Sequence, residues 1–317
     1  MKLLSIVFAA LALLAPLSSR AQAYPNKPIK LIVPAPAGGP TDVPARLAAE
    51  GLGNLAGQRF VVENKAGAGG LIGAEFVARA EPDGYTLLYA NTSVVAVIPA
   101  LQPKIAYDPG AFVAVGFVSN SPQLLIANPR FPVKSVRELV EYARAHPGKV
   151  NFASGGVGSL PHLTFELFRL ESGIDAIHVP YAGGAPATAA LMAGQADVLF
   201  DLVRTRVKSG DVRALAITGE ARDPELPDVP TIGEAGYPAV TSTSFTGIVA
   251  PPGTPRVVVT VLNAKLNELH QSPEFQARMK SFGLVPKAST PEEFAAYAAR
   301  EREKWLRVVK ASGAKPD

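Results

Sequence analysis

The sequence contains no cysteine among its 317 residues. Disulfide bridges, cysteine metal sites and thiol catalysis are therefore excluded. A chain of this length can still bury a core sufficient for two α/β domains without covalent cross-links. We expect the fold to depend on its hydrophobic core alone.

The sequence also lacks blocks of like charge, low-complexity tracts and repeats of solenoid period. Its formal net charge is +4, and two of the positive charges, Lys2 and Arg20, lie within the first 23 residues. The remaining charges are scattered and nearly balanced. This distribution argues against binding of nucleic acid or other polyanions.

Long apolar runs are confined to the N-terminus. Met1 and Lys2 precede an apolar run over residues 3–17, and small residues follow at Ala21-Gln22-Ala23. This order is typical of a secretory signal peptide over residues 1–23, cleaved after Ala23. The alternative, a membrane anchor, needs about twenty apolar residues, and this run is shorter. We expect a soluble mature protein outside the cytoplasm.

Short β-rich runs alternate with longer runs rich in Ala, Leu and Glu, which predicts an α/β fold with largely parallel sheets. The predicted strands cover residues 29–33, 59–63, 86–90, 113–118, 124–127, 150–153, 176–179, 196–201, 212–218 and 246–250. The predicted helices cover residues 42–55, 71–80, 136–145, 162–171, 186–193, 256–271, 273–281 and 291–312.

Two segments, 117–126 and 245–253, have the pattern of crossings between domains. They predict a discontinuous first domain, residues 24–121 plus 248–317, and a second domain, residues 122–247. We expect a ligand cleft between them, because α/β sheets bind ligands at the carboxyl ends of their strands. The alternative is one continuous domain with long loops.

The segment 28–46 carries the strongest functional signal. An apolar strand runs into a loop rich in Pro and Gly, which ends at Thr41 and Asp42, two good helix N-caps. A strand, a glycine loop and a helix start form a cradle of backbone N–H groups that suits an anion. The loop has no lysine, so a carboxylate held by neutral donors fits better than a nucleotide phosphate.

The segment 150–163 repeats this design. Its loop offers the hydroxyls of Ser154 and Ser159 beside free backbone N–H groups, which suit a carboxylate. The competing interpretation, a nucleophilic serine in a hydrolase, is weak because Val157 and Pro161 replace the glycines of the Gly-x-Ser-x-Gly motif. His162 is better explained by the helix start or by packing than as a base.

No motif predicts a cofactor or a metal. The glycines of segment 67–73 have the spacing Gly-x-Gly-x-x-x-Gly, and no acidic residue follows at the position that a dinucleotide site needs. A tight turn explains them better. His146, His178 and His270 stand apart from one another and from carboxylates at ligand spacing.

Four further residues are placed by their strands at the predicted cleft. Asn91 and Ser93 follow a strand, so they either donate to a ligand or cap the next turn. Tyr181 lies in a strand-to-helix turn and would line the cleft. Asp201 ends an apolar strand, where its carboxylate either binds a ligand group or a water, or locks two loops together.

These segments together resemble the substrate-binding receptors of tripartite tricarboxylate transporters, the Bug family. The resemblance covers essentially the whole mature chain, and its specificity comes from the number and order of short motifs. The resembling segments are 24–46, 57–74, 83–88, 107–109, 158–163, 178–181, 194–197, 213–216, 226–231, 234–236, 250–255 and Trp305.

The resemblance implies a periplasmic receptor with a two-domain, type II periplasmic-binding-protein fold and no enzyme activity. Such receptors close by a hinge on a small carboxylate and deliver it to a membrane permease. The family's ligand contacts, mainly backbone amides, carry over to Ala37, Gly38, Gly39, Thr41 and Asp42 in one domain. In the other domain they carry over to Ser154, Gly155, Ser159 and Leu160, and we include His162 with them.

Three departures from the family bear on the ligand. Ala35 stands where relatives usually have an aromatic residue, Pro40 and Pro44 stiffen the helix start, and the loop after Asp201 is about three residues shorter. Arg204 and Arg206 in that short loop would place a cation near the ligand. We expect these changes to favour a bulkier acid, such as an aromatic carboxylate, over a four-carbon dicarboxylate.

The sequence leaves two other functions open. A ligand-sensing receptor with a signalling partner has the same sequence logic as a transport receptor. A secreted α/β hydrolase would need a nucleophile, a base and an orienting acid, and the sequence shows no such triad. We expect a monomer without a cofactor.

Overall fold

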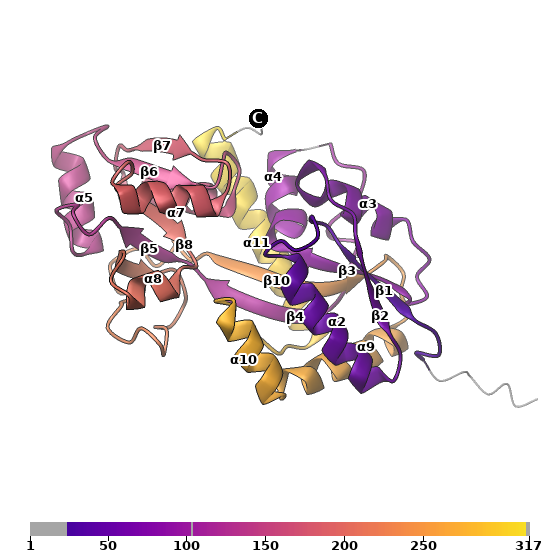
Figure 1. The fold of residues 1–317 in the computed structure, drawn as a ribbon. Coiled ribbons are helices and arrows are strands. Elements are labelled where there is room, and N and C mark those ends of the chain that lie inside the picture. The colour runs from indigo at the N-terminus through magenta and orange to yellow at the C-terminus, as the bar shows by residue number, and fades with distance from the viewer. Residues whose placement is uncertain (1–23, 103, 315–317) are drawn as a thin grey trace, which may run out of the picture.

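The computed structural model describes residues 24–102 and 104–314, so the signal peptide predicted over residues 1–23 lies outside the described residues. The strands form two five-stranded sheets with helices around them (Figure 1). The first sheet has the order β2 (Phe60–Asn64), β1 (Ile29–Val33), β3 (Thr86–Asn91), β10 (Thr243–Ala250) and β4 (Val113–Pro122). The second has the order β7 (Ile177–Pro180), β6 (Asn151–Ser154), β8 (Val198–Asp201), β5 (Leu124–Ala127) and β9 (Arg213–Ile217).

The two sheets share one plan. In each, three neighbouring strands are parallel, the next strand is antiparallel to them, and the last is antiparallel to that one. Four strands of each sheet therefore point the same way, and their carboxyl ends meet at one edge. We call the halves built on these sheets the first lobe and the second lobe.

The helices follow the predicted pattern closely. The predicted helices appear as α2 (Asp42–Ala56), α3 (Leu71–Ala78), α5 (Val136–Ala145), α6 (Leu160–Ser172), α7 (Gly184–Ala193), α9 (Arg256–His270), α10 (Pro273–Ser281) and α11 (Pro291–Ser312). The sequence did not predict the short elements η2 (Ala68–Gly70), η3 (Ser93–Val97, a π-helical turn), α4 (Ile98–Leu101) and α8 (Arg204–Lys208).

Two strands run side by side between the lobes. β4 pairs with β10 from Val113 opposite Ala250 to Pro122 opposite Thr243, so the two predicted crossings form one antiparallel ribbon (Figure 1). Only Gln123 separates β4 from β5 of the second sheet. Its buried side-chain amide donates to Thr164 Oγ1 and Ser242 Oγ, both at 2.8 Å, which fixes the chain where it changes sheets.

Helix α11 packs against both lobes. Phe294 and Ala298, near its start, belong to a core cluster of the first lobe. Trp305, Val308 and Val309, near its end, belong to the core cluster of the second lobe, although the sequence assigns them to the first domain. The limits of the two predicted domains stay a prediction, but the last helix couples the lobes (Figure 1).

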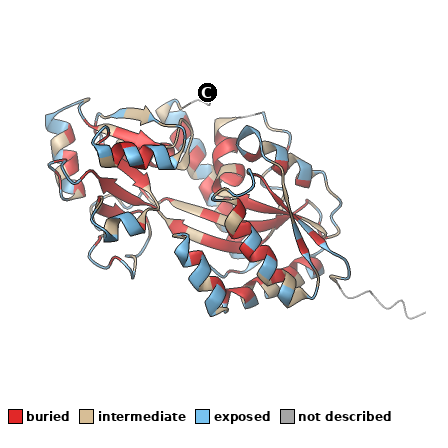
Figure 2. Cartoon of the chain, viewed as in Figure 1, coloured by how far each residue is buried: buried red, intermediate tan, exposed pale blue. Residues whose placement is uncertain are grey.

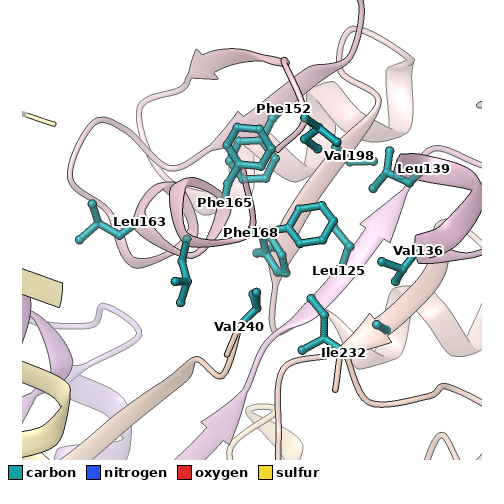
Figure 3. Packing of buried hydrophobic residues seen from close by; sticks show 14 of the residues in the cluster. Leu125, Val136, Leu139, Phe152, Leu163, Phe165, Phe168, Val198, Ile232 and Val240 are labelled. Atoms are coloured by element: carbon teal, nitrogen blue, oxygen red, sulfur yellow. The ribbon is translucent and has the colours of Figure 1, made fainter. Parts of the chain in front are cut away.

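The core lies along the sheets, with exposed residues gathered on the outer faces of the helices (Figure 2). In the second lobe, Phe152 of β6 stacks on Phe165 of α6 with ring centroids 3.8 Å apart, and Phe168 packs nearby (Figure 3). This packing seats the start of α6 against the end of β6. It therefore sets the position of the loop that joins them.

Candidate functional site

The first loop, residues 34–41 between β1 and α2, is stabilised by hydrogen bonds to the buried carboxylate of Asp42. Asp42 is 1% exposed, and its Oδ2 accepts hydrogen bonds from Gly38 N and Arg46 Nε, both at 2.8 Å. Asn64 Nδ2 donates to Asp42 Oδ1 at 2.8 Å and to Ala35 O at 3.0 Å. Asp42 is thus occupied in shaping the loop, and both carboxylate oxygens have protein partners.

The pKa of Asp42 reflects these contacts. Burial raises the pKa of this carboxyl, but the hydrogen bonds from Arg46, Gly38 and Asn64 outweigh burial and hold it below its ordinary value. The carboxylate is therefore ionised over the neutral range. Its charge is matched by the Arg46 guanidinium, so the loop presents no net charge from this pair.

The first loop offers backbone donors at its surface. Gly38 N donates to Asp42 and Gly39 N donates weakly to Pro36 O at 3.4 Å. Within the part of the chain that the structure describes, the amides of Ala37 and Thr41 have no protein acceptor. A Cβ added at Gly38 would meet nothing within 4 Å, so the space beside the loop is open there.

The glycine turn and the π-helical turn pack behind the first loop. A Cβ at Gly70 would lie 2.6 Å from Val94 Cγ1 and 3.2 Å from Pro34 O, so this close approach needs glycine. Ser93 Oγ donates to Gly69 O at 3.3 Å, and Asn91 Oδ1 accepts from Val94 N at 3.1 Å. Asn91 and Ser93 thus make the local contacts that were one of their two predicted roles, and their contact with a ligand stays a prediction.

The second loop, residues 155–159 between β6 and α6, has the same kind of donors. Ser159 caps α6, with its Oγ accepting from His162 N at 3.4 Å. Among the described residues, the amides of Gly155 and Leu160 have no protein acceptor. The amide of Leu160 lies at the start of the thirteen-residue helix α6, where the helix dipole adds positive potential, and that of Gly155 lies directly after β6.

Two histidines lie beneath the second loop. Ser154 is fully buried, and its Oγ lies 2.6 Å from His178 Nε2. His162 is 6% exposed, and its Nδ1 accepts from Gly158 N at 3.0 Å. His162 and Ser154 are buried, whereas His178 is partly buried. The sequence analysis predicted an isolated His178, because Ser154 and His178 lie 24 positions apart on separate strands and no local motif connects them.

Tyr181 and Asp201 complete the predicted set. Tyr181 is half-buried and packs against a core cluster of the second lobe beside the second loop, where its own amide donates to Ser154 O at 2.9 Å. Asp201 accepts from Thr188 Oγ1 at 2.6 Å and from Leu202 N at 2.7 Å. Burial raises the pKa of the Asp201 carboxyl above its ordinary value, against these hydrogen bonds. The carboxylate thus links helix α7 to the loop after β8, where the prediction was a link between two loops, and its contact with a ligand stays a prediction.

Arg204 and Arg206, which were expected to place a cation near the ligand, form salt bridges with aspartates. Arg204 is 7% exposed, forms a salt bridge with Asp223, and donates to Gly283 O at 3.1 Å. Arg206 pairs with Asp211 at 2.9 Å. Both guanidiniums have carboxylate partners, so they do not provide the free charge that the short loop suggested.

The two loops belong to different lobes that touch. A Cβ at Gly158 of the second loop would lie 2.7 Å from Leu101 Cδ1 of α4 in the first lobe. Two sets of unpartnered backbone donors therefore lie on lobes joined by the β4–β10 ribbon. Such an arrangement can hold an anion through neutral N–H groups from both sides.

Two searches of the described residues bear on other classes of site. No group of three or more His, Cys, Asp or Glu side chains there is arranged to hold a metal ion. None of the helices in residues 24–102 and 104–314 is both long and apolar enough to cross a membrane.

The chain matches known solute receptors along most of its length. Residues 44–314 match the model of the tripartite tricarboxylate transporter family receptor. Protein BugT of Bordetella pertussis (strain Tohama I) is 38% identical, with 98% of this chain and 97% of that protein covered.

Two solved structures have the same architecture. The periplasmic binding protein BugD has a TM-score of 0.74 and 36% identity, covering 93% of this chain and 100% of that one. MatC from Rhodopseudomonas palustris, solved with bound malate, has a TM-score of 0.74 and 34% identity, covering 90% and 100%. These likenesses confirm the predicted two-domain type II fold, with each sheet mixed at its antiparallel strand.

Proposed function

Because the chain belongs to the tripartite tricarboxylate transporter receptor family, we propose that it captures a small carboxylate between its lobes and delivers it to a membrane permease. The observation that carries the proposal is the pair of loops with unpartnered amides, Ala37 and Thr41 in the first lobe and Gly155 and Leu160 in the second. The export signal predicted over residues 1–23 supports a periplasmic location.

Binding works through closure of the lobes. A ligand held by only one loop makes half of the available contacts, whereas a ligand held by both favours the state in which the lobes are close. The β4–β10 ribbon and Gln123 connect the lobes and are the segments that closure would bend. The permease then receives the ligand from the closed receptor.

The proposed receptor binds its ligand without converting it. Ser154 Oγ lies 2.6 Å from His178 Nε2, a contact between a serine hydroxyl and a histidine ring. The serine hydroxyl is fully buried and already accepts from Gly156 N at 3.2 Å, so a substrate cannot reach it. Burial of this hydroxyl argues against the hydrolase alternative.

The ligand class depends on the wall of the site. MatC binds malate, a four-carbon dicarboxylate, which makes a small dicarboxylate the family-based choice. Ala35 is a half-buried residue of the first loop that packs against a core cluster of the first lobe, and its side chain is smaller than the aromatic residue expected at this position. We therefore place an aromatic carboxylate such as benzoate ahead of malate or succinate.

Isothermal titration tests both levels of the proposal. Saturable binding of one benzoate per chain, tighter than that of succinate and malate, is the expected result. The variant Ala35→Phe should weaken benzoate binding and leave succinate binding intact, because it replaces the small side chain with an aromatic one. Tight succinate binding with no benzoate binding rejects the aromatic choice and keeps the carboxylate receptor.

The transport partner needs its own experiment. A pull-down from membranes with the ligand-loaded protein should recover an integral permease subunit. Recovery of a sensor protein in its place would favour the ligand-sensing alternative, which shares the same binding site.

A further inference from the structure

Two imidazole rings from separate elements stack beneath the second loop. His162 lies in the first turn of α6 and His178 lies on β7, and their ring centroids are 4.0 Å apart with planes at 16°. His162 Nδ1 holds Gly158 N near the end of the loop, and His178 Nε2 contacts Ser154 Oγ at its start. The stack therefore ties the two ends of the loop together.

The contact with Gly158 fixes the protonation state of His162. A backbone N–H is always a donor, so Nδ1 must be the unprotonated nitrogen and the neutral ring must carry its proton on Nε2. A proton added to Nδ1 would turn this acceptor into a second donor. The hydrogen bond from Gly158 would then be lost.

Ser154 connects the His178 ring to the second loop, because it contacts both His178 and Gly156. Its hydroxyl donates to Gly156 O at 3.1 Å and accepts from Gly156 N at 3.2 Å. Its oxygen also lies 2.6 Å from His178 Nε2, where the tautomer of the ring decides which atom donates. Gly156 and Gly158 have φ values of 118° and 74°, so the loop has a backbone conformation that needs such support.

We propose that His162 and His178 are positioning residues that hold the second loop in its ligand-binding conformation, and that they do so only while His162 is uncharged. This inference rests on the proposed function, because it takes the second loop to be a ligand contact. Protonation of His162 releases Gly158 and lowers ligand affinity. Affinity should therefore fall when the pH is lowered far enough to protonate His162.

The charged groups around His162 and His178 have opposing effects on the protonation of His162. Glu166 Oε1 of α6 lies 4.0 Å from His162 Nε2 and favours the charged ring. Arg169 pairs with Glu166 at 2.8 Å and offsets that effect. Each ring also faces the other, so a proton on His178 disfavours a proton on His162.

Hydrogen exchange measured by mass spectrometry on the full-length, ligand-free protein tests the inference. His162→Asn keeps an acceptor near the position of Nδ1 and does not titrate, whereas His162→Leu has none. His146→Asn is the control, because His146 is an exposed histidine of the same lobe that stacks on Tyr142. Peptides from β1 and β3 show whether a variant is folded.

At neutral pH, the backbone amides of residues 155–159 should exchange roughly fivefold faster in His162→Leu than in wild type, because one hydrogen bond is lost. His162→Asn and His146→Asn should match wild type. Between about pH 7.5 and about pH 5.5, on either side of the ordinary pKa of histidine, wild type should lose protection after correction for intrinsic exchange. His162→Asn should keep it.

Wild-type exchange in His162→Leu, or equally fast exchange in His162→Asn and His162→Leu, would overturn the positioning role. An equal loss of protection at low pH in wild type and His162→Asn would overturn the charge dependence. Both readouts use no ligand, so failure of benzoate, succinate and malate to bind rejects the proposed function without affecting this result.

Discussion

At the scale of single residues, the buried side chain of Asp42 shapes the first loop, and its contact with a ligand stays a prediction. The Thr41-Asp42 pair marks a helix start in the sequence, and a cap is the ordinary expectation for it. In the structure neither residue caps α2 with its side chain. The Asp42 carboxylate instead collects donors from Gly38, Arg46 and Asn64.

Replacing this carboxylate tests its structural role. Asp42→Asn should lower the free energy of unfolding by about 1–3 kcal/mol at neutral pH, because buried donors lose a charged acceptor. Urea unfolding followed by circular dichroism measures the change. Glu141→Gln removes an exposed partner of Arg137, 3.9 Å away, and should change stability by less than about 0.5 kcal/mol. Equal effects of the two variants would contradict the anchoring role.

The direction in which pH changes the stability difference between wild type and Asp42→Asn follows from the lowered pKa of Asp42. The native pKa of Asp42 lies below its ordinary value, so its contribution is complete above the unfolded pKa of about 4. That contribution is lost as pH falls through the lower native pKa. The stability gap between wild type and Asp42→Asn should therefore narrow in acid, and a gap that widens in acid would contradict the account.

At the scale of elements, the second loop depends on glycine at a place where two lobes meet. Gly158 has φ of 74°, and a Cβ there would overlap Leu101 of α4. Gly173, at the end of α6, has φ of 66° with nothing within 4 Å of a Cβ. Both glycines have a left-handed backbone conformation, but only Gly158 has a neighbouring side chain close to the position of a Cβ.

This difference gives a matched pair of variants. Gly158→Ala and Gly173→Ala should each lower the free energy of unfolding by about 1 kcal/mol, the cost of a left-handed alanine. Only Gly158→Ala should also weaken carboxylate binding, because the added methyl displaces the loop or α4. Titration with benzoate and malate measures this. Normal affinity in Gly158→Ala would show that the contact with Leu101 does not set the loop.

The elements also show which parts of the fold a sequence can predict. Long periodic helices such as 136–145 and 291–312 were predicted to the residue, because apolar spacing and caps mark them directly. The π-helical turn Ser93–Val97 was missed, since its run of β-branched residues has no helical period. The stacked histidines were missed because contacts between separate elements leave no mark in local spacing.

At the scale of the whole molecule, Arg204 joins the second lobe to the first. It pairs with Asp223, and its guanidinium donates to Gly283 O at 3.1 Å on the segment between α10 and α11. Burial raises the pKa of Asp223, but its hydrogen bonds, including that from Arg204, hold it below its ordinary value. Removing Arg204 would leave a buried carboxylate without its partner.

Stability measurements test the Arg204–Asp223 pair. Arg204→Ala should lower the free energy of unfolding by about 3–5 kcal/mol, because Asp223 keeps its charge in a buried place. Arg206→Ala, which breaks an exposed pair with Asp211, should cost at most about 1 kcal/mol. Urea unfolding compares the two variants. Similar losses would mean that the Arg204–Asp223 pair contributes no more to stability than an exposed pair.

If neutral backbone donors of both lobes hold a small carboxylate, the negative charge of the ligand is essential for binding. Isothermal titration can compare each acid with its neutral amide, with benzoate and benzamide, succinate and succinamide, and malate and malamide. We expect saturable binding of one acid per chain for at least one pair, with no measurable binding of the matching amide. Equal binding of acid and amide, or no binding of any acid, would contradict it.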